Sequence, residues 1–132
     1  MSGKVRIDLR TVTPAYIQIM QQIQSQILSN QIHPGDQLPT VRQLAAELEI
    51  NFNTVARAYR LLDKAGLITT RQGRGTYVSK NAGTPAELRL NLLNELTASY
   101  LSEVRRLEYN VEDVIHAFLA QLEKIKQTAP TD

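Results

Sequence analysis

Apolar residues recur at helical spacing in five segments of this chain, and between residues 67 and 79 the pattern changes to short runs of β-forming residues. The first helical segment follows Thr13 and Pro14, which we expect to be its N-cap and its first helical residue. It ends near Asn30, before a Pro-Gly turn. Ahead of it, apolar and charged residues alternate between positions 4 and 10, which predicts a short half-buried strand or an extended arm.

The second and third helical segments are short and are separated by a tight turn. Thr40 is expected to cap the second segment, which lasts little more than two turns, and Asn51 or Asn53 is expected to cap the third. Gly66 marks the end of the third segment, at the left-handed position that follows many helices. Two short helices joined in this way are typical of a helix-turn-helix. The face opposite the apolar stripe of the third segment carries residues at i, i+4, i+7 and i+11: Asn53, Arg57, Arg60 and Lys64.

A β-hairpin is predicted after these helices. Residues 67–71 and 76–79 are rich in β-forming residues and are joined through Gln72-Gly73-Arg74-Gly75. The two glycines tolerate positive φ, so the turn can approach a sugar-phosphate backbone closely. Because the hairpin follows a helix-turn-helix, we interpret it as a wing and expect residues 1–80 to form a winged helix-turn-helix domain.

A separate helical region is predicted over residues 84–127, beyond a polar linker at residues 80–83. Thr84 and Glu87 form a capping pattern for the first of its two helices, Asn110 is expected to cap the second, and residues 128–132 are expected to be a frayed tail. The fold class is therefore mainly α with a small β-wing, a winged domain followed by a two-helix dimerisation region.

The apolar stripes of the last two helices are too extensive for so small a winged domain to cover. A second copy of the chain would cover them, so we expect a homodimer. The alternative is that the helices fold back on their own domain in a monomer. The residues expected at the dimer interface are Leu93, Leu96, Tyr100, Val104, Leu107, Val111, Ile115, Phe118 and Leu122.

Composition and charge narrow the function further. Residues 1–80 hold ten Lys and Arg against five Asp and Glu, a net charge of +5, whereas residues 81–132 hold five against eight, a net charge of −3. The basic front half favours a polyanionic partner there. There is no Cys, no apolar run of membrane-spanning length and no secretory signal pattern, so a cytoplasmic protein is expected. No catalytic triad, phosphate-binding loop or metal-ligand spacing is present, so we expect neither enzyme activity nor a cofactor or metal.

The candidate DNA contacts follow from the chemistry of the grooves. Asn can pair bidentately with adenine and Arg with guanine, while the Thr54 methyl group can touch a thymine methyl. The alternative for each residue is structural, because asparagines also cap helices and exposed basic residues also form a solvated face or, at Arg42, a surface ion pair. The full set of candidates is Thr40, Arg42, Asn51, Asn53, Thr54, Arg57, Arg60, Arg71, Gln72, Gly73 and Arg74.

Several runs of residues closely resemble the N-terminal domain of GntR-family bacterial transcription regulators over about residues 10–79. The resemblance implies that the operator is contacted by Arg42, Asn51, Asn53, Thr54 and Arg57. It also implies that Gln72, Gly73 and Arg74 form the wing tip. Phe52 departs from the pattern, since some relatives carry a polar or basic residue there. The runs that carry the resemblance are Pro14-Ala-Tyr16-Ile-Gln-Ile19, Pro34-Gly35, Leu38-Pro39, Arg42-Gln-Leu-Ala45, Asn53-Thr54-Val55, Ala58-Tyr59, Gly66-Leu-Ile68 and Gly73-Arg-Gly-Thr-Tyr-Val78.

The family divides by its C-terminal region, and two helices are too few for its larger effector domains. The arrangement resembles the short YtrA-type branch, in which the helices mainly make a dimer. The resemblance thus implies a homodimeric repressor on a palindromic operator in double-stranded DNA. Some relatives sense small molecules, but no residue cluster here identifies an effector pocket. The alternative is an interaction module in which the winged domain binds a protein or RNA partner and the helices oligomerise it.

Overall fold

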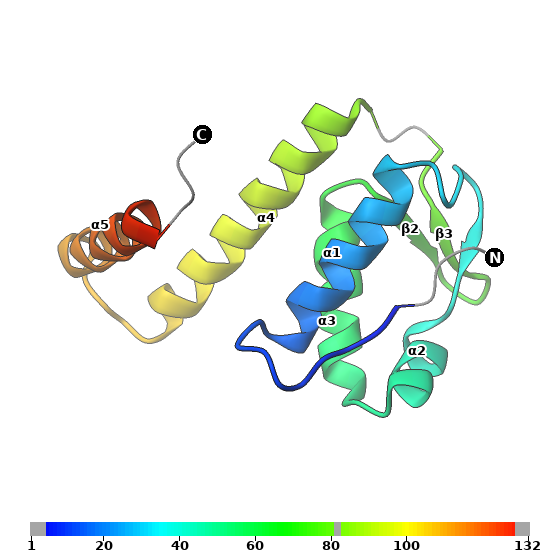
Figure 1. Ribbon diagram of the computed structural model, residues 1–132, viewed down its shortest axis with the longest axis horizontal. Coiled ribbons are helices and arrows are strands. Elements are labelled where there is room, and N and C mark those ends of the chain that lie inside the picture. Colours follow the sequence, from blue (N-terminus) through cyan, green and yellow to red (C-terminus); the bar gives the residue numbers. More distant parts are fainter. Residues whose placement is uncertain (1–4, 81–82, 129–132) are drawn as a thin grey trace. The chain divides into compact units, whose positions relative to one another are not determined.

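The computed structural model describes residues 5–80 and 83–128, and it is mainly helical with one small antiparallel sheet (Figure 1). This confirms the expected fold class. Contacts divide the chain into two compact units, Met1–Leu96 and Thr97–Asp132. The helices are α1 (Ala15–Leu28), α2 (Val41–Leu48), α3 (Phe52–Lys64), α4 (Pro85–Arg106) and α5 (Val111–Thr128), and the strands are β1 (Gln37–Leu38), β2 (Ile68–Arg71) and β3 (Gly75–Val78).

The core of the first unit lies where α3 packs against α1, α2 and β2. Its fully buried side chains are aliphatic, as expected for a chain with few aromatic residues. Leu88 and Leu92 from the beginning of α4 are buried in the same core, and Asn91 Nδ2 donates to the Ala65 carbonyl at 3.2 Å. We expected the winged domain to end at residue 80. The compact unit instead continues to Leu96, because the first turns of α4 contribute leucines to its core.

The sheet has the order β1-β3-β2, and both pairs of strands are antiparallel. The β2–β3 hairpin pairs Arg71 with Gly75, and the Arg74 amide donates to the Arg71 carbonyl at 2.9 Å to close the turn. This confirms the predicted hairpin. Strand β1 was not predicted, since its two residues, Gln37 and Leu38, are too few to produce an alternating pattern.

Side-chain caps fix the beginnings of four helices as expected. Thr40, Asn51, Thr84 and Asn110 each accept a backbone N–H from the first turn of the following helix. The expectation for α1 was wrong: the helix begins at Ala15, Pro14 occupies the cap position with an extended ψ of 147°, and no side chain caps it.

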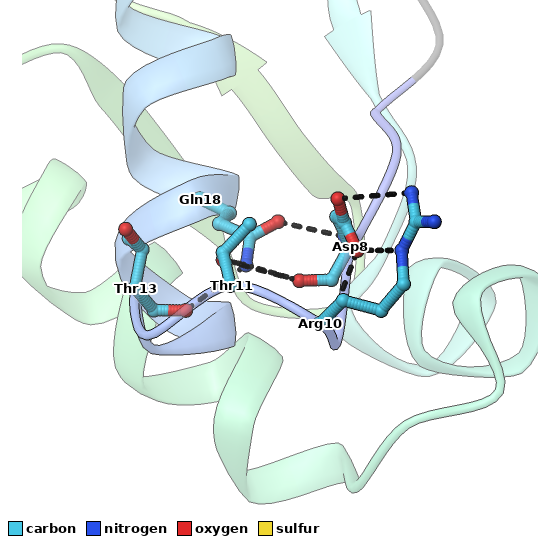
Figure 2. A network of polar contacts seen from close by, with 5 residues as sticks. All are labelled: Asp8, Arg10, Thr11, Thr13 and Gln18. Atoms are coloured by element: carbon cyan, nitrogen blue, oxygen red, sulfur yellow. Dashed lines mark hydrogen bonds and ion pairs between the residues drawn. The ribbon is translucent and has the colours of Figure 1, made fainter.

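Residues 5–8 form an arm that two glutamines of α1 hold in place, and a turn with bends at residues 9–13 leads from the arm into the helix. Gln22 accepts from the Arg6 amide at 2.8 Å and donates to the Arg6 carbonyl at 2.6 Å. Gln18, one turn earlier, exchanges the same two bonds with Asp8, at 2.8 and 2.9 Å (Figure 2). The side-chain amides therefore take the place of a neighbouring strand. Of the two alternatives that the sequence left open, a half-buried strand and an extended arm, the arm is observed, since residues 5–8 pair with no strand that the structure describes.

The end of the chain differs slightly from expectation. Helix α5 includes Thr128, whose hydroxyl donates to the Lys124 carbonyl at 3.1 Å. The expected frayed tail began at residue 128, and the rest of it, residues 129–132, lies outside the described residues.

Candidate nucleic-acid interface

The helix-turn-helix is built from α2 and α3. Local interactions fix the beginning of α2 and the turn that leads from α2 into α3. The Thr40 hydroxyl accepts from the Gln43 amide at 3.1 Å, and the Gln43 side chain accepts from the Thr40 amide at 2.9 Å, a complete capping box. Glu49 adopts a left-handed φ of 55°, which turns the chain into α3. Arg42 lies exposed in the first turn of α2, where backbone amides and a guanidinium can together meet a phosphate.

Tyr59 couples the two helices through the core. Its ring is 3% exposed, and its hydroxyl donates to the Pro39 carbonyl at 2.7 Å, just before α2 begins. Burial raises the pKa of the Tyr59 hydroxyl, and the charge of Glu47 raises it further, so the hydroxyl stays protonated and keeps donating this bond. The entry to α2 is thereby tied to the middle of α3.

The two candidate asparagines have different tasks at the start of α3. The Asn51 amide oxygen accepts from the Asn53 backbone N–H at 2.7 Å and caps the helix. Asn53 is exposed in the first turn. A bidentate contact with adenine needs both the oxygen and the nitrogen of one side-chain amide. Because Asn51 already uses its oxygen as a cap, Asn53 is the better placed of the two for such a contact.

The face of α3 opposite the core is polar and basic. Asn53, Arg60 and Lys64 are exposed, and Thr54 and Arg57 are half-buried beside them. The Arg57 guanidinium carbon lies 4.0 Å from the ring centroid of Tyr16, in the first turn of α1. This contact was missed from the sequence, in which Tyr16 is part of a run that resembles the family and was given no role at the interface. No local sequence pattern signalled it, because the two residues lie 41 positions apart in the chain.

The wing tip is exposed and basic. Arg71, Gln72, Gly73 and Arg74 are all exposed, and Gly73 has a φ of 77°. The Tyr77 hydroxyl donates to the Arg74 carbonyl at 2.8 Å, and this bond stabilises the turn.

Beside the wing lies an open hollow of about 640 Å³. Its charged lining residues are the basic Arg71, Arg74 and Lys80 and the single carboxylate of Asp63. Asp63, near the end of α3, accepts from the Thr70 amide at 3.3 Å, so the carboxylate also ties β2 to the helix. The net positive charge of this hollow fits a phosphate group.

All eleven candidate DNA contacts lie in three places: the start of α2, the exposed side of α3 and the tip of the β2–β3 hairpin. Helix α3 contacts both α2 and β2, so the three places belong to adjoining elements of one compact unit. No group of three or more metal-ligating side chains occurs among residues 5–80 and 83–128.

The candidate dimerisation residues are less uniform. Leu96 is half-buried and packs against the core of the first unit, so it is not available to a partner in the way that the sequence suggested. Leu93 is 58% exposed. In the second unit Val104 is half-buried, whereas Tyr100, Leu107, Val111, Ile115, Phe118 and Leu122 are all exposed.

Within the second unit, the end of α4 contacts α5 through the rings of Tyr100 and Phe118, whose centroids are 6.5 Å apart. No residue of α5 is buried, although one face of this helix is almost entirely apolar. Val104 and Val114 line an open groove of about 500 Å³ between the two helices. Among the helices that the structure describes, none has the length and apolarity needed to cross a membrane.

Comparison with known proteins agrees with this geometry. The family model described as bacterial regulatory proteins, gntR family, matches residues 15–78. The HTH-type transcriptional repressor YtrA of Bacillus subtilis is 49% identical over 80 residues, which is 61% of this chain and 62% of that repressor, less than two thirds of its length. YhcF, an uncharacterised HTH-type transcriptional regulator of the same organism, is 31% identical over 102 residues, which is 77% of this chain and 84% of the length of YhcF.

A solved structure extends the similarity. YtrA from Sulfolobus acidocaldarius, described as a GntR-family transcription factor, matches with a TM-score of 0.55 and 29% identity, covering 92% of this chain and 99% of that one. The match therefore includes the two C-terminal helices as well as the winged domain.

Proposed function

Because this chain belongs to the GntR family of bacterial regulatory proteins, we propose that it represses transcription in the cytoplasm as a homodimer on a two-fold symmetric operator. One observation carries the proposal: the exposed face of α3 gathers Asn53, Arg57, Arg60 and Lys64 next to a basic wing. An α-helix of this kind fits the major groove of B-DNA, and its first turns reach the base edges.

In this proposal the beginning of α3 reads bases. Asn53 pairs with an adenine, Arg57 pairs with a guanine, and the Thr54 methyl group packs against a thymine methyl. Asn51 caps the helix and contributes its amide nitrogen at most, since its oxygen is bonded to the Asn53 amide.

The remaining candidates hold the sugar-phosphate backbone. Thr40 and Arg42 present a hydroxyl, a guanidinium and the amide end of α2 to one phosphate. Arg60, which lies further along α3, contacts a second phosphate. At the wing, Arg71 and Arg74 supply positive charge, while Gln72 and Gly73 allow close approach of the turn. These contacts give affinity with little dependence on sequence.

Dimerisation is proposed through α5 and the exposed side of α4. Six of the nine candidate side chains are exposed in the second unit and include aromatic and aliphatic groups, which a second copy would remove from water. A two-fold dimer places two α3 helices on half-sites about one helical turn apart or a multiple of it. The repressive sign of regulation rests on similarity to the repressor YtrA.

The proposal is tested by selecting a duplex from a random library with the full chain and measuring its affinity and its salt dependence. We expect a selected sequence with two-fold symmetry, two copies of the chain per duplex, and a steep linear fall of log affinity with log salt. Undetectable duplex binding at low salt would contradict the proposal and favour a protein or RNA partner.

Arg57→Ala and Arg74→Ala form a matched pair for the two kinds of contact. Arg57→Ala should cost about 1–3 kcal/mol at one base pair and relax specificity there. Arg74→Ala should weaken all duplexes to a similar extent and reduce the salt slope by about 1. Equal losses on selected and random duplexes for Arg57→Ala would remove its role in reading bases.

A further inference from the structure

The first turn of α1 lies against the base-reading side of α3. Tyr16 is half-buried and packs against the core, and its ring lies beneath the Arg57 guanidinium, with the guanidinium carbon 4.0 Å from the ring centroid. This distance is well inside the limit of about 6 Å for an interaction between a cation and an aromatic face. The candidate guanine reader therefore rests on a residue from a different helix.

We propose that Tyr16 is a positioning residue for Arg57, so that α1 contributes to base specificity without touching DNA. This inference rests on the proposed function. An arginine side chain loses considerable rotamer freedom when it is fixed at an interface. The contact with Tyr16 restricts Arg57 before DNA arrives, so less of that entropy is lost on binding. A guanidinium can stack on an aromatic face while its in-plane donors make hydrogen bonds, so the two contacts are compatible.

The position of Tyr16 is itself fixed by the segment that leads into α1. Gln18 Nε2 donates to the Thr13 carbonyl at 3.0 Å and to the Asp8 carbonyl at 2.9 Å (Figure 2). Both bonds hold the segment that precedes Pro14, and the nearer acceptor, Thr13, lies three residues ahead of Tyr16. The ring therefore stands on a rigid first turn, which is what a support for another side chain requires.

The experiment replaces Tyr16 in the full chain with phenylalanine and then with phenylalanines carrying one, two and three ring fluorines. Fluorine withdraws charge from the ring face with little change in shape, so it weakens attraction for a cation and leaves packing nearly intact. The probe is the duplex selected by the unaltered protein, together with variants changed at single base pairs. We expect Tyr16→Phe to bind about as tightly as the unaltered chain, and the dissociation constant to rise stepwise with fluorination, by about threefold to tenfold in total.

The loss should be confined to the base pair that Arg57→Ala also releases, and fluorination should have no effect in an Arg57→Ala background. Melting temperatures, measured by circular dichroism, should stay constant across the series. Equal affinity across the fluorinated series would overturn the inference, as would an equal loss on random duplexes.

These outcomes separate the inference from the proposed function. If the unaltered chain selects a duplex and Arg57→Ala relaxes one position, but ring fluorination changes nothing, only the role of Tyr16 fails. If the unaltered chain selects no duplex at all, the proposed function fails and this inference fails with it. Tyr16→Leu offers a second test, since it removes the ring and keeps an apolar side chain against the core. It should reproduce the specificity loss of the most fluorinated variant.

Discussion

At the start of α3, two asparagines separated by Phe52 differ in what their side chains do. Asn51 holds the helix end through its side-chain oxygen, and Asn53 supplies the backbone N–H that this oxygen accepts. The Asn53 side chain is exposed and lies on the same face as Arg60 and Lys64. Substitutions at the two positions should therefore affect different properties of the protein.

Asn51→Ala should lower the free energy of unfolding by about 1 kcal/mol, because an N-cap oxygen is lost and the backbone N–H groups of the first turn lose a partner. Asn53→Ala should leave stability nearly unchanged, because alanine favours a helix, and should weaken binding at one base pair of the selected duplex. Thermal unfolding and duplex titration of both variants check this pair. A larger loss of stability for Asn53→Ala than for Asn51→Ala would contradict the division of tasks.

Tyr59→Phe tests the bond that ties α2 to α3. Removing the buried hydroxyl leaves the Pro39 carbonyl without its donor, and we expect a loss of about 1 kcal/mol in unfolding free energy. Tyr77→Phe is a matched control, since its hydroxyl donates to the exposed Arg74 carbonyl, where water can replace it. Urea unfolding of both variants gives the comparison, and equal losses would argue against a special role for Tyr59.

Tyr59→Phe should also change how the free energy of unfolding depends on pH. Burial raises the pKa of Tyr59 above its ordinary value of 10.0 in the folded chain, so above that pH the unfolded chain releases a proton that the folded chain keeps. The unfolded state then binds fewer protons, and stability falls as pH rises. Below pH 10 this contribution is fully present. Unfolding free energies measured from about pH 9 to pH 11 should fall more steeply for the unaltered chain than for Tyr59→Phe.

At the scale of elements, the wing depends on two glycines with different backbone demands. Gly73 has a φ of 77°, near the left-handed region that asparagine tolerates, whereas Gly75 has a φ of 111°, which L residues rarely adopt. A Cβ at Gly75 would lie 3.0 Å from the Gln37 amide nitrogen, whose flexible side chain can move away. The backbone conformation is therefore the main cost.

Gly75→Ala should destabilise the protein by about 1–3 kcal/mol and Gly73→Ala by about 1 kcal/mol, with Gly73→Asn costing less still. Thermal unfolding of the three variants orders them. Because the Gln37 side chain can move, adding Gln37→Ala to Gly75→Ala should recover little stability. A full recovery would show that steric contact, and not backbone strain, sets the cost.

Elements whose ends depend on neighbouring residues could be predicted from sequence, and those that depend on distant contacts could not. The caps at Thr40, Asn51 and Asn110 lie within three residues of the amides they accept from, so the pattern is visible in the chain itself. Strand β1 forms only because residues 37 and 38 meet β3, about forty positions away. The glutamine bonds to the arm are likewise made across 10 and 16 positions.

The candidate site shows the same division. The exposed face of α3 followed from helical period alone, because residues at i, i+4, i+7 and i+11 share a face wherever the helix lies. The contact between Arg57 and Tyr16 joins helices 41 positions apart in the chain, and no local pattern encodes it. The burial of Leu88 and Leu92 is similar, since the sequence indicated an apolar stripe on α4 but not that its first turns would complete the winged core.

At the scale of the whole molecule, the net positive charge and the exposed apolar face of α5 belong to different parts of the chain. The net charge of +5 belongs to residues 1–80, with all eleven candidate DNA contacts, and the net charge of −3 belongs to residues 81–132, with the exposed apolar face of α5. Pairing through the acidic half would join two basic winged domains in one particle. The number of phosphate contacts, and with it the salt slope, would then be twice that of a single copy.

The double variant Ile115→Asp and Leu122→Asp places two charges on the exposed apolar face of α5, where the side chains are 48% and 36% exposed. Burying unpaired carboxylates at an interface is costly, so we expect a monomer by light scattering. Affinity for a duplex with two half-sites should fall about 100-fold or more, to that for a single half-site, and the salt slope should halve.

Ala120→Asp, an exposed position on the opposite face of α5, introduces a similar charge and should leave mass and affinity unchanged. A double variant that keeps its mass would place the dimer interface elsewhere, and one that becomes monomeric without losing affinity would separate dimerisation from operator binding.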